Sequence, residues 1–374
     1  MKILFVLEYY LPYIGGLETV FQEILERLVK LGHEVNIITI KLPGTLEYEE
    51  IRGVKVHRVS VPTIGSRYWF DFLFSIPKTY ALAKNSDIIH ASDYITAFPV
   101  WFVGKIQKKP CIMTVTEPIG NMWHSVLGVN YFKGKIFQLF ENLLFCLPFD
   151  KYLCISYYTK NCLRFMGIPD RRIMTIYLGV DEIQFNANRI SNSQIREKYG
   201  IQDKFIYLSF GRPGITKGID YLIGAVPIIS EKIQNSILLL ILSKDPPDRY
   251  ELLKKMISDK HLNNVIIIDP VPREELPDYI GASDCVVVPS LTEGFGFTAA
   301  EACAMDKPVV ATNVGSLPEV VSGTHILIEP RDSEAIASAV IRIAQGNGET
   351  TSQKRFGWDK CVKEYLELYN QVIH

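Results

Sequence analysis

The sequence predicts an α/β fold made of two doubly wound parallel sheets, each in its own domain. Short apolar runs alternate with longer helical patterns, and this alternation restarts after residue 200. Most of these runs are apolar at nearly every position, which is typical of strands buried on both faces of a parallel sheet. With 374 residues, the chain is long enough for two such domains. We place the domains at residues 1–182 and 183–350, with a last helix in 351–374.

The first half opens with a strand and an amphipathic helix. "KILFVLE" is expected to be a buried strand, and "TVFQEILERLVKLG" places Val20, Ile24, Leu28 and Leu31 on one helical face before a stop at Gly32. Four further strands are expected along this half, in the stretches "HEVNIITI", "SDIIHAS", "PCIMTVT" and "KYLCIS".

The second half repeats the same pattern with more strongly apolar strands. Five are expected, in "KFIYLSF", "SILLLIL", "NVIIIDP", "DCVVVPS" and "KPVVATN". Apolar periodicity stops at "LGVDEIQFNANRISNS", so we place the hinge between the domains there. The polar stretch "GETTSQKRFGWDK" precedes the last helix.

Composition excludes several classes of protein. A net charge of −1 provides no basic field for nucleic acid, so no nucleic-acid partner is expected. The N-terminus lacks a cleavage signal, and no apolar run is long enough to span a bilayer. Seven cysteines without a Cys-x-x-Cys pair, among them Cys146 and Cys285 in apolar runs, indicate buried thiols in a reducing compartment. We therefore expect a cytoplasmic protein.

Two glycine-containing loops follow expected strands and precede helices, where open α/β sheets bind ligands. Gly15 and Gly16 open the first helix, and the loop "SFGRPGITKG" carries Arg212 and Lys217. Backbone amides and two cations suit a diphosphate. The alternatives are a tight turn without ligand in the first loop and two solvated cations in the second.

A third loop, "SLTEGFGFTAAEA", carries two carboxylates eight residues apart, Glu293 and Glu301. Between them, Gly294 to Phe297 form the turn into a helix, whose free amides can bind phosphate. Carboxylates accept hydrogen bonds from diols. A ligand that is anionic in its middle and hydroxylated at both flanks, such as a sugar nucleotide, satisfies both features. The alternatives are a solvated pair of acids and a dinucleotide site, since "GFGFTA" loosely fits that pattern.

A fourth loop, "TVTEPIGNMWHS", places Glu117 and His124 after a strand of the first domain. We consider both as candidates on the acceptor side and, equally, as structural residues. No Asp-x-Asp and no His or Cys cluster with metal-ligand spacing occurs, so neither a metal nor another cofactor is expected.

These loops, in this order, resemble the family 4 retaining glycosyltransferases of the GT-B fold. The resemblance rests on "GGLETVFQEILERLVKLGHEVNIIT", "YLGVDEIQF", "FGRPGITKG" and the Glu-x₇-Glu stretch "PSLTEGFGFTAAEACAMDKPVVATNVGSLPEVV". It implies two Rossmann-like domains facing a deep interdomain cleft. Residues 1–182 would form the acceptor side and residues 183–350 the nucleotide-sugar side. The last helix would pack back on the first domain.

The resemblance also implies roles for the candidate residues. Arg212 and Lys217 would hold the donor diphosphate, Glu293 the donor sugar and Glu301 the ribose. Backbone amides would reach the donor around one helix start, and further donor contacts would come from the first domain and from the loop that flanks the base; these residues are Gly294, Phe295, Gly296, Phe297, Thr298, Gly15, Gly16 and Val271 within the 269–273 loop. Glu293, Arg212 and Lys217 would be the catalytic residues.

Several positions depart from the family pattern. Thr116 stands where many members carry histidine, and Leu178 stands where asparagine is common. Asp269 and Asp306 replace usual glycines. The change at Thr116 concerns the acceptor side and leaves the donor loops intact.

The resemblance implies transfer of a hexosyl unit from a UDP- or GDP-sugar, as co-substrate, to an acceptor hydroxyl of a glycan or a lipid-linked glycan, with retention of configuration. The alternatives are a sugar-nucleotide epimerase or phosphorylase of the same fold and a non-catalytic subunit. Trp69, Trp101 and Trp123 belong to a first half rich in aromatic residues, with the segments "SRYWFDFLF" and "NYFKGKIFQLFENLLFCLPF". These segments suit either peripheral contact with the cytoplasmic membrane face or domain packing.

Overall fold

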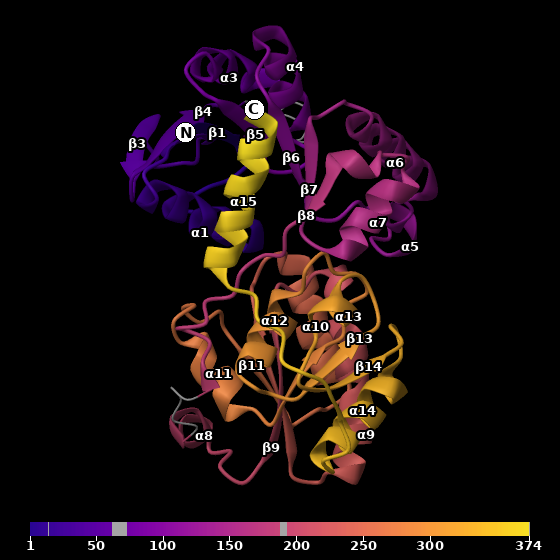
Figure 1. Ribbon diagram of the computed structural model, residues 1–374. Coiled ribbons are helices and arrows are strands. Elements are labelled where there is room, and N and C mark those ends of the chain that lie inside the picture. The colour runs from indigo at the N-terminus through magenta and orange to yellow at the C-terminus, as the bar shows by residue number, and fades with distance from the viewer. Residues whose placement is uncertain (14, 62–72, 188–192, 374) are drawn as a thin grey trace. The chain divides into compact units, whose positions relative to one another are not determined.

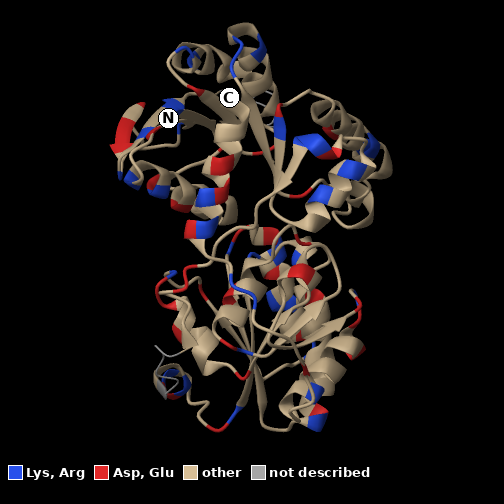
Figure 2. Cartoon of the chain, in the orientation of Figure 1, with Lys and Arg blue, Asp and Glu red and all other residues tan. Residues whose placement is uncertain are grey.

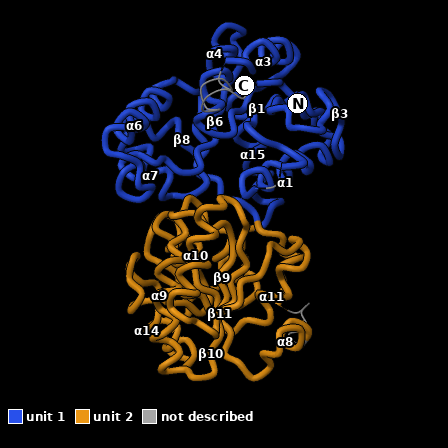
Figure 3. Tube along the Cα trace, turned by 180° about the vertical axis from the view of Figure 1, so that it is seen from behind, with its two compact units in different colours: residues 1–179, 357–374 blue, residues 180–356 orange. Residues whose placement is uncertain are grey.

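The computed structural model describes residues 1–13, 15–61, 73–187 and 193–373. The chain divides into two compact units (Figure 3). Unit 1 comprises residues 1–179 and 357–374, and unit 2 comprises residues 180–356. Trp69 and most of the aromatic segment "SRYWFDFLF" lie outside the described residues.

Unit 1 contains an eight-stranded sheet with the order β3-β4-β2-β1-β5-β6-β7-β8. All neighbouring strands are parallel except β3 and β4, which form an antiparallel hairpin at one edge. The strands are β1 (Lys2–Val6), β2 (Glu34–Ile40), β3 (Tyr48–Ile51), β4 (Val54–Val59), β5 (Ile88–Ala91), β6 (Cys111–Val115), β7 (Lys151–Cys154) and β8 (Ile173–Thr175).

Helices cover both faces of this sheet (Figure 1). Successive residues of β1 point to opposite faces, so Phe5 contacts Phe21 of α1 while Leu4 belongs to the apolar cluster beneath α3 and α4. The helices of unit 1 are α1 (Gly16–Lys30), α3 (Ile76–Ala83), α4 (Ala97–Gln107), α5 (Met122–Ser125), α6 (Tyr131–Phe145), α7 (Tyr157–Phe165) and α15 (Trp358–Ile373), with the short η1 (Asp170–Arg172).

The expected buried face of α1 is correct for Val20, Ile24 and Leu28 but wrong for Leu31. Leu31 caps the helix after its last turn and is 59% exposed. The expectation for cysteines fails in the same way at Cys146, which caps α6 and is exposed, whereas Cys285 is buried. In both cases the residue caps the end of a helix and lies outside the buried face of that helix.

The C-terminal helix α15 packs in unit 1, against α1 and the sheet. Tyr365 and Tyr369 are fully buried on its inner face. The side chain of His90, on strand β5, contacts this face, with Nδ1 2.7 Å from the Tyr369 hydroxyl and Nε2 2.8 Å from Thr114 Oγ1. His90 therefore links the end of the chain to two central strands.

We expect His90 to make the stability of unit 1 depend on pH. Burial lowers the pKa of His90 to about 3 from its ordinary 6.5. The unfolded chain therefore binds a proton below pH 6.5 that the folded chain does not, and stability falls as the pH falls through this range. Between pH 7 and 5 the wild type should lose about 2 kcal/mol more unfolding free energy than His90→Gln, at about 1.4 kcal/mol per pH unit. Urea unfolding at both pH values measures this, and equal losses in the two proteins would contradict it.

Unit 2 contains a seven-stranded sheet with the order β11-β10-β9-β12-β13-β14-β15. Its strands are parallel except β15, which pairs antiparallel with β14 at the edge. The strands are β9 (Phe205–Gly211), β10 (Ser236–Leu242), β11 (Val265–Ile268), β12 (Cys285–Val288), β13 (Val309–Thr312), β14 (Thr324–Ile328) and β15 (Glu349–Thr350).

Helices of unit 2 also lie on both sides of its sheet, with α9 and α14 on one side and α8 and α11 on the other (Figure 1). Strand β10, second from one edge of the sheet, is buried at all seven positions, as its unbroken apolar run predicts. The helices are α8 (Ser193–Tyr199), α9 (Ile219–Lys232), α10 (Pro247–Asp259), α11 (Leu276–Ala282), α12 (Phe297–Ala304), α13 (Leu317–Val320) and α14 (Ser333–Ala344), with the short η3 (Ile215–Lys217).

The prediction of two parallel sheets layered with helices is confirmed. The ten expected strands are present, and sequence reasoning missed β3, β4, β8, β14 and β15. These strands lie toward or at the edges of the sheets, where one side is free to carry polar residues, so their sequences lack an unbroken apolar run. No helix in the described part of the chain is long and apolar enough to cross a membrane.

Candidate functional site

In unit 2, the loops that follow β9 and β12 meet at the carboxyl ends of these two strands. β9 and β12 are neighbours in the sheet, so the loops leave it side by side. The amide of Leu291 donates to the carbonyl of Thr216 at 2.6 Å. Lys217 Nζ lies 2.7 Å from Glu293 Oε2. Two residues predicted to share a donor site, 76 positions apart in the chain, thus form an ion pair.

Gly218 allows this close approach. It has a φ of +62°, and a Cβ atom there would lie 2.0 Å from the carbonyl oxygen of Pro289. Any side chain would therefore push the loop after β9 away from the loop after β12. Gly218, the last glycine of "FGRPGITKG", therefore helps to position Lys217.

Glu293 is held by its backbone as well as by its side chain. Ser290 Oγ donates to Glu293 Oε2 at 3.2 Å. The amide and the hydroxyl of Ser316 both donate to the Glu293 carbonyl, at 2.9 and 3.1 Å. Gly315 has a φ of +57°, and a Cβ there would lie 2.2 Å from the same carbonyl oxygen. The sequence pattern predicted no role for Gly315 or Ser316.

The glycine turn after Glu293 ends at the start of α12. Gly296 caps this helix at a φ of +93° without a side-chain hydrogen bond to its first amides. Phe295 is buried against Phe297 and Phe356, so only its backbone can face a ligand. Thr298 Oγ1 donates to the carbonyl of Phe210 at 3.3 Å, which ties α12 to the end of β9. The first amides of α12 therefore lie beside the two loops and can donate hydrogen bonds to an anion.

Glu301 is buried inside α12, with 2% of its side chain exposed. Burial raises the pKa of its carboxyl, and the guanidinium of Arg273 opposes this rise. Arg273 Nη2 lies 2.7 Å from Glu301 Oε1, and the guanidinium stacks 5.1 Å from the centre of the Phe185 ring. Sequence reasoning placed Arg273 in the base-flanking loop but did not predict that it pairs with Glu301.

We expect Arg273→Ala to destabilise unit 2 in a pH-dependent way. Without the cation, burial alone acts on Glu301, so its carboxylate costs folding energy at neutral pH. The cost should be about 2 kcal/mol at pH 8, less than the 3–5 kcal/mol of a fully buried pair because Arg273 is partly exposed. It should shrink toward pH 5, because the raised pKa lets the folded state take up a proton.

Urea unfolding of Arg273→Ala at pH 5 and pH 8 measures this effect. Lys244→Ala is a matched control, since Lys244 forms an exposed pair with Asp269 at 2.9 Å. The control should lose little stability at either pH, because solvent screens an exposed pair. An equal loss at both pH values in Arg273→Ala would show that the cation does not act through Glu301.

The remaining donor-side candidates lie in the same unit at the ends of their strands. Arg212 follows β9 directly, and its side chain is exposed. Arg249 of α10 supports the loop after Arg212, because its Nε donates to the Pro213 carbonyl at 3.4 Å. Val271 follows β11 and is half-buried. The roles of Arg212 and Val271 stay predictions.

In unit 1, Gly15 caps α1 and Gly16 is its first residue. A Cβ at Gly16 would meet nothing within 4 Å, so this helix start is open to a ligand's approach. The loop before it is held by Arg58, whose fully buried guanidinium donates to the Leu11 carbonyl at 2.7 Å and pairs with Glu49. The sequence did not predict the role of Arg58, because a charged residue within a strand is usually expected to face solvent. The donor contacts of Gly15 and Gly16 stay predictions.

The acceptor-side candidates lie after β6. Glu117 is half-buried in the loop, and His124 lies on α5 with an exposed side chain. His124 Nδ1 is 3.1 Å from the carbonyl of Val129, and the ring meets Tyr131 edge-on. The structure thus gives His124 local structural contacts, and its predicted role stays untested.

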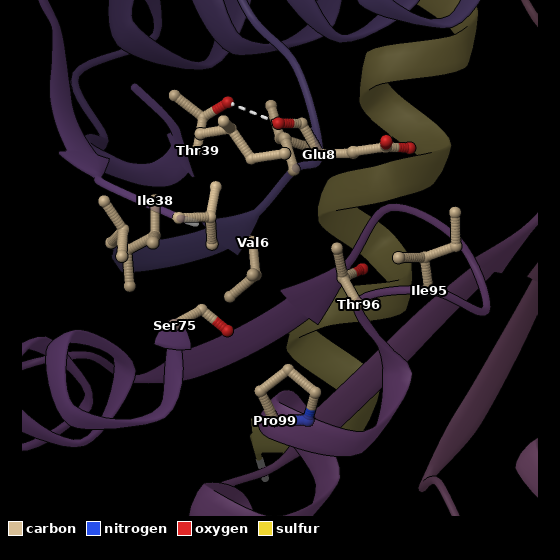
Figure 4. A pocket seen from close by; sticks show the side chains of 12 residues that line it. Val6, Glu8, Ile38, Thr39, Ser75, Ile95, Thr96 and Pro99 are labelled. Carbon is tan, nitrogen blue, oxygen red and sulfur yellow. Dashed lines mark hydrogen bonds between the residues drawn. The ribbon is translucent and has the colours of Figure 1, made fainter. Parts of the chain in front are cut away.

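A pocket of unit 1 opens at the carboxyl ends of β1 and β2, beside the start of α4 (Figure 4). Val6, Ile38, Thr96 and Pro99 line it, and Thr39 Oγ1 donates to the Glu8 carbonyl at its rim, at 2.9 Å. Neither Glu117 nor His124 is among its lining residues. Across the described ranges, no group of three His, Cys, Asp or Glu side chains is placed to hold a metal ion.

Two family models together match most of the chain. The family model "Glycosyl transferases group 1" matches residues 191–357, and "Glycosyltransferase Family 4" matches residues 14–183. Uncharacterized glycosyltransferase MJ1607 of Methanocaldococcus jannaschii is 30% identical over 99% of this chain and 98% of its own length. The chain belongs to glycosyltransferase family 4. The predicted family resemblance is thereby confirmed.

More distant proteins show how far the likeness extends. The GPI3 subunit of phosphatidylinositol N-acetylglucosaminyltransferase from Saccharomyces cerevisiae is 23% identical over 98% of this chain and 82% of its own. The crystal structure of Anabaena Alr3699/HepE in complex with UDP and glucose superposes with a TM-score of 0.76 at 19% identity, covering 99% and 100% of the two chains. The GT-B fold class predicted for this glycosyltransferase is confirmed by this likeness and by the two Rossmann-like units.

Proposed function

We propose that this glycosyltransferase moves a hexosyl unit from a UDP- or GDP-sugar to an acceptor hydroxyl with retention of configuration. The observation that carries the proposal is the meeting of Lys217, Glu293 and the start of α12 at one edge of the unit 2 sheet. A cation and free helix amides suit a diphosphate, and a carboxylate suits sugar hydroxyls. The UDP and glucose held by the structurally similar HepE support a nucleotide sugar as donor.

The principal chemical task is to stabilise the departing nucleoside diphosphate, which gains negative charge as the glycosidic bond breaks. In our proposal, Lys217, Arg212 and the first amides of α12 oppose that charge. Each such prepositioned group contributes about 2.7–4 kcal/mol in comparable sites. Glu301, paired with Arg273, would accept hydrogen bonds from the ribose.

Lys217 is paired with Glu293 at 2.7 Å. An incoming diphosphate therefore competes with Glu293 for the ammonium group. Once the phosphate takes over this cation, the carboxylate is released toward the donor sugar. The ion pair thus keeps both side chains in position until the donor exchanges their partners.

Retention is explained by attack from the face that the leaving group occupies. The bond from the anomeric carbon to the diphosphate oxygen breaks, and a bond to the acceptor oxygen forms on the same face. The acceptor's proton passes to the leaving phosphate oxygen, so no enzyme base or covalent intermediate is needed. The proposal includes no metal, and we expect turnover to persist in excess chelator.

On the acceptor side we propose a lipid-linked glycan, with the protein acting at the cytoplasmic face of a membrane. The relative from Saccharomyces cerevisiae named for phosphatidylinositol provides one comparison. Residues of unit 1 supply a second argument, which concerns the outer face of α6 and is developed below.

A thermal-shift screen with UDP, GDP and ADP and their hexose conjugates tests the proposal. A ligand that binds only the folded state at 100 times its Kd stabilises it by about 2.7 kcal/mol, which raises the melting temperature measurably. One nucleoside diphosphate should stand out, and its sugar conjugate should be hydrolysed or transferred slowly. If no nucleoside diphosphate shifts the melting temperature at millimolar concentration, the proposed donor site is wrong.

A further inference from the structure

Helix α6 carries a stripe of large apolar side chains on its outer face. Phe132, Ile136, Leu139 and Leu143 recur at intervals of four, three and four residues, so they lie along one side of the helix. Their exposed fractions are 75%, 50%, 61% and 58%. Amphipathic helices of globular proteins bury such a stripe, whereas here it faces outward.

The opposite side of α6 is firmly packed, so the stripe is not the result of a loosely attached helix. Gly134, Glu141, Leu144 and Phe145 are buried there. Asn130 caps the helix start, with its side chain accepting from the amide of Phe132. The helix therefore has two apolar sides, and only one of them is used within the unit.

Positive charge flanks the outward stripe. Lys133 and Lys135 are both exposed on α6. Figure 2 shows where Lys and Arg lie along the helices of unit 1. Between residues 121 and 148 the sequence contains one acidic residue, Glu141, and its side chain is buried. The exposed face of this segment is thus apolar and cationic, with no exposed carboxylate among its residues.

We infer that this face, defined by Phe132, Ile136, Leu139 and Leu143 with Lys133 and Lys135, docks on the surface of an anionic lipid bilayer. Apolar side chains can enter the acyl boundary while lysines reach the phosphate headgroups beside them. A second copy of the chain fits less well, because a symmetric contact would bring the same lysines together without an acid to offset them.

The buried side of α6 connects this face to the acceptor-side loop. Glu141 accepts hydrogen bonds from the amides of Ile119 and Gly120, both at 2.7 Å. That loop also carries Glu117, a candidate on the acceptor side. Docking through α6 would therefore place the loop close to headgroups that carry a lipid-linked acceptor. This last step rests on the proposed function, whereas docking itself does not.

Flotation with extruded vesicles tests the docking surface without donor or turnover. At low salt the wild type should float with vesicles of phosphatidylcholine and phosphatidylglycerol, and far less with phosphatidylcholine alone. Phe132→Gln/Leu139→Gln should bind the anionic vesicles at least about tenfold more weakly, since two inserted side chains are lost. Lys133→Gln/Lys135→Gln should bind both vesicle types alike.

Leu31→Gln/Leu46→Gln is the matched control, because these leucines are 59% and 64% exposed in the same unit, away from α6. It should bind like the wild type. The inference is overturned if the wild type does not float with anionic vesicles. It is also overturned if the α6 variants float unchanged, or if the wild type is a dimer in solution that these variants make monomeric. A nucleoside diphosphate shift that persists in the α6 variants would separate a failure here from a failure of the donor site.

Discussion

Glu293→Gln should lower kcat/KM about 100- to 1,000-fold while leaving affinity for the nucleoside diphosphate unchanged or higher. The carboxylate is proposed to act on the donor sugar, so its loss removes contacts that the diphosphate does not make. Glutamine also no longer competes for Lys217, whose Nζ is 2.7 Å from Glu293 Oε2. Steady-state kinetics together with calorimetric titration of the nucleoside diphosphate measure both effects.

Glu274→Gln is a suitable control, since Glu274 is an exposed carboxylate of the same unit. It should change neither quantity. A parallel fall of turnover and of diphosphate affinity in Glu293→Gln would contradict the proposed exchange of partners, because it would show that the carboxylate supports the phosphate rather than the sugar.

Gly315→Ala should destabilise unit 2 by about 2–5 kcal/mol and reduce turnover. Two effects add, a φ of +57° that costs an alanine about 1–2 kcal/mol and a Cβ placed 2.2 Å from the Glu293 carbonyl oxygen. Since that carbonyl is backbone, relief of the clash must move Glu293 itself. Urea unfolding and kcat/KM report the two consequences.

Gly346→Ala separates these effects. Gly346 has a φ of +77°, but a Cβ there would meet nothing within 4 Å. It should therefore cost about 1–2 kcal/mol, with normal turnover. If both variants lost the same unfolding free energy and retained full activity, the contact between Gly315 and Glu293 would not matter for turnover.

Much of this architecture could be predicted from sequence because it depends on local signals. Continuous apolar runs such as Ser236–Leu242 identify buried parallel strands without knowledge of their partners. The carboxyl ends of such strands meet at one edge, so the loops with Lys217 and Glu293 could be expected to converge. The hairpin of β3 and β4 was missed because its exposed edge needs no apolar run.

Other features depend on contacts between distant segments, and sequence patterns do not reveal these. Arg273 pairs with Glu301 across 28 positions, and Gly315 lies against the Glu293 carbonyl across 22. The outward face of α6 was left open between packing and membrane contact, because periodicity shows that a helix has an apolar side but not which neighbour covers it. Solvent exposure in the folded chain shows only that this face is not covered within unit 1.

The central claim is that Lys217 and Arg212 neutralise the diphosphate of the donor. Calorimetric titration of the wild type and of Arg212→Ala/Lys217→Ala, with the nucleoside diphosphate and monophosphate of the preferred base, tests it most directly. The wild type should bind the diphosphate at least about tenfold more tightly, since each charge-assisted contact contributes about 1.5–3 kcal/mol. The double variant should bind both nucleotides with nearly equal affinity. If it keeps the full preference for the diphosphate, these two cations do not hold that group, and the proposed site is contradicted.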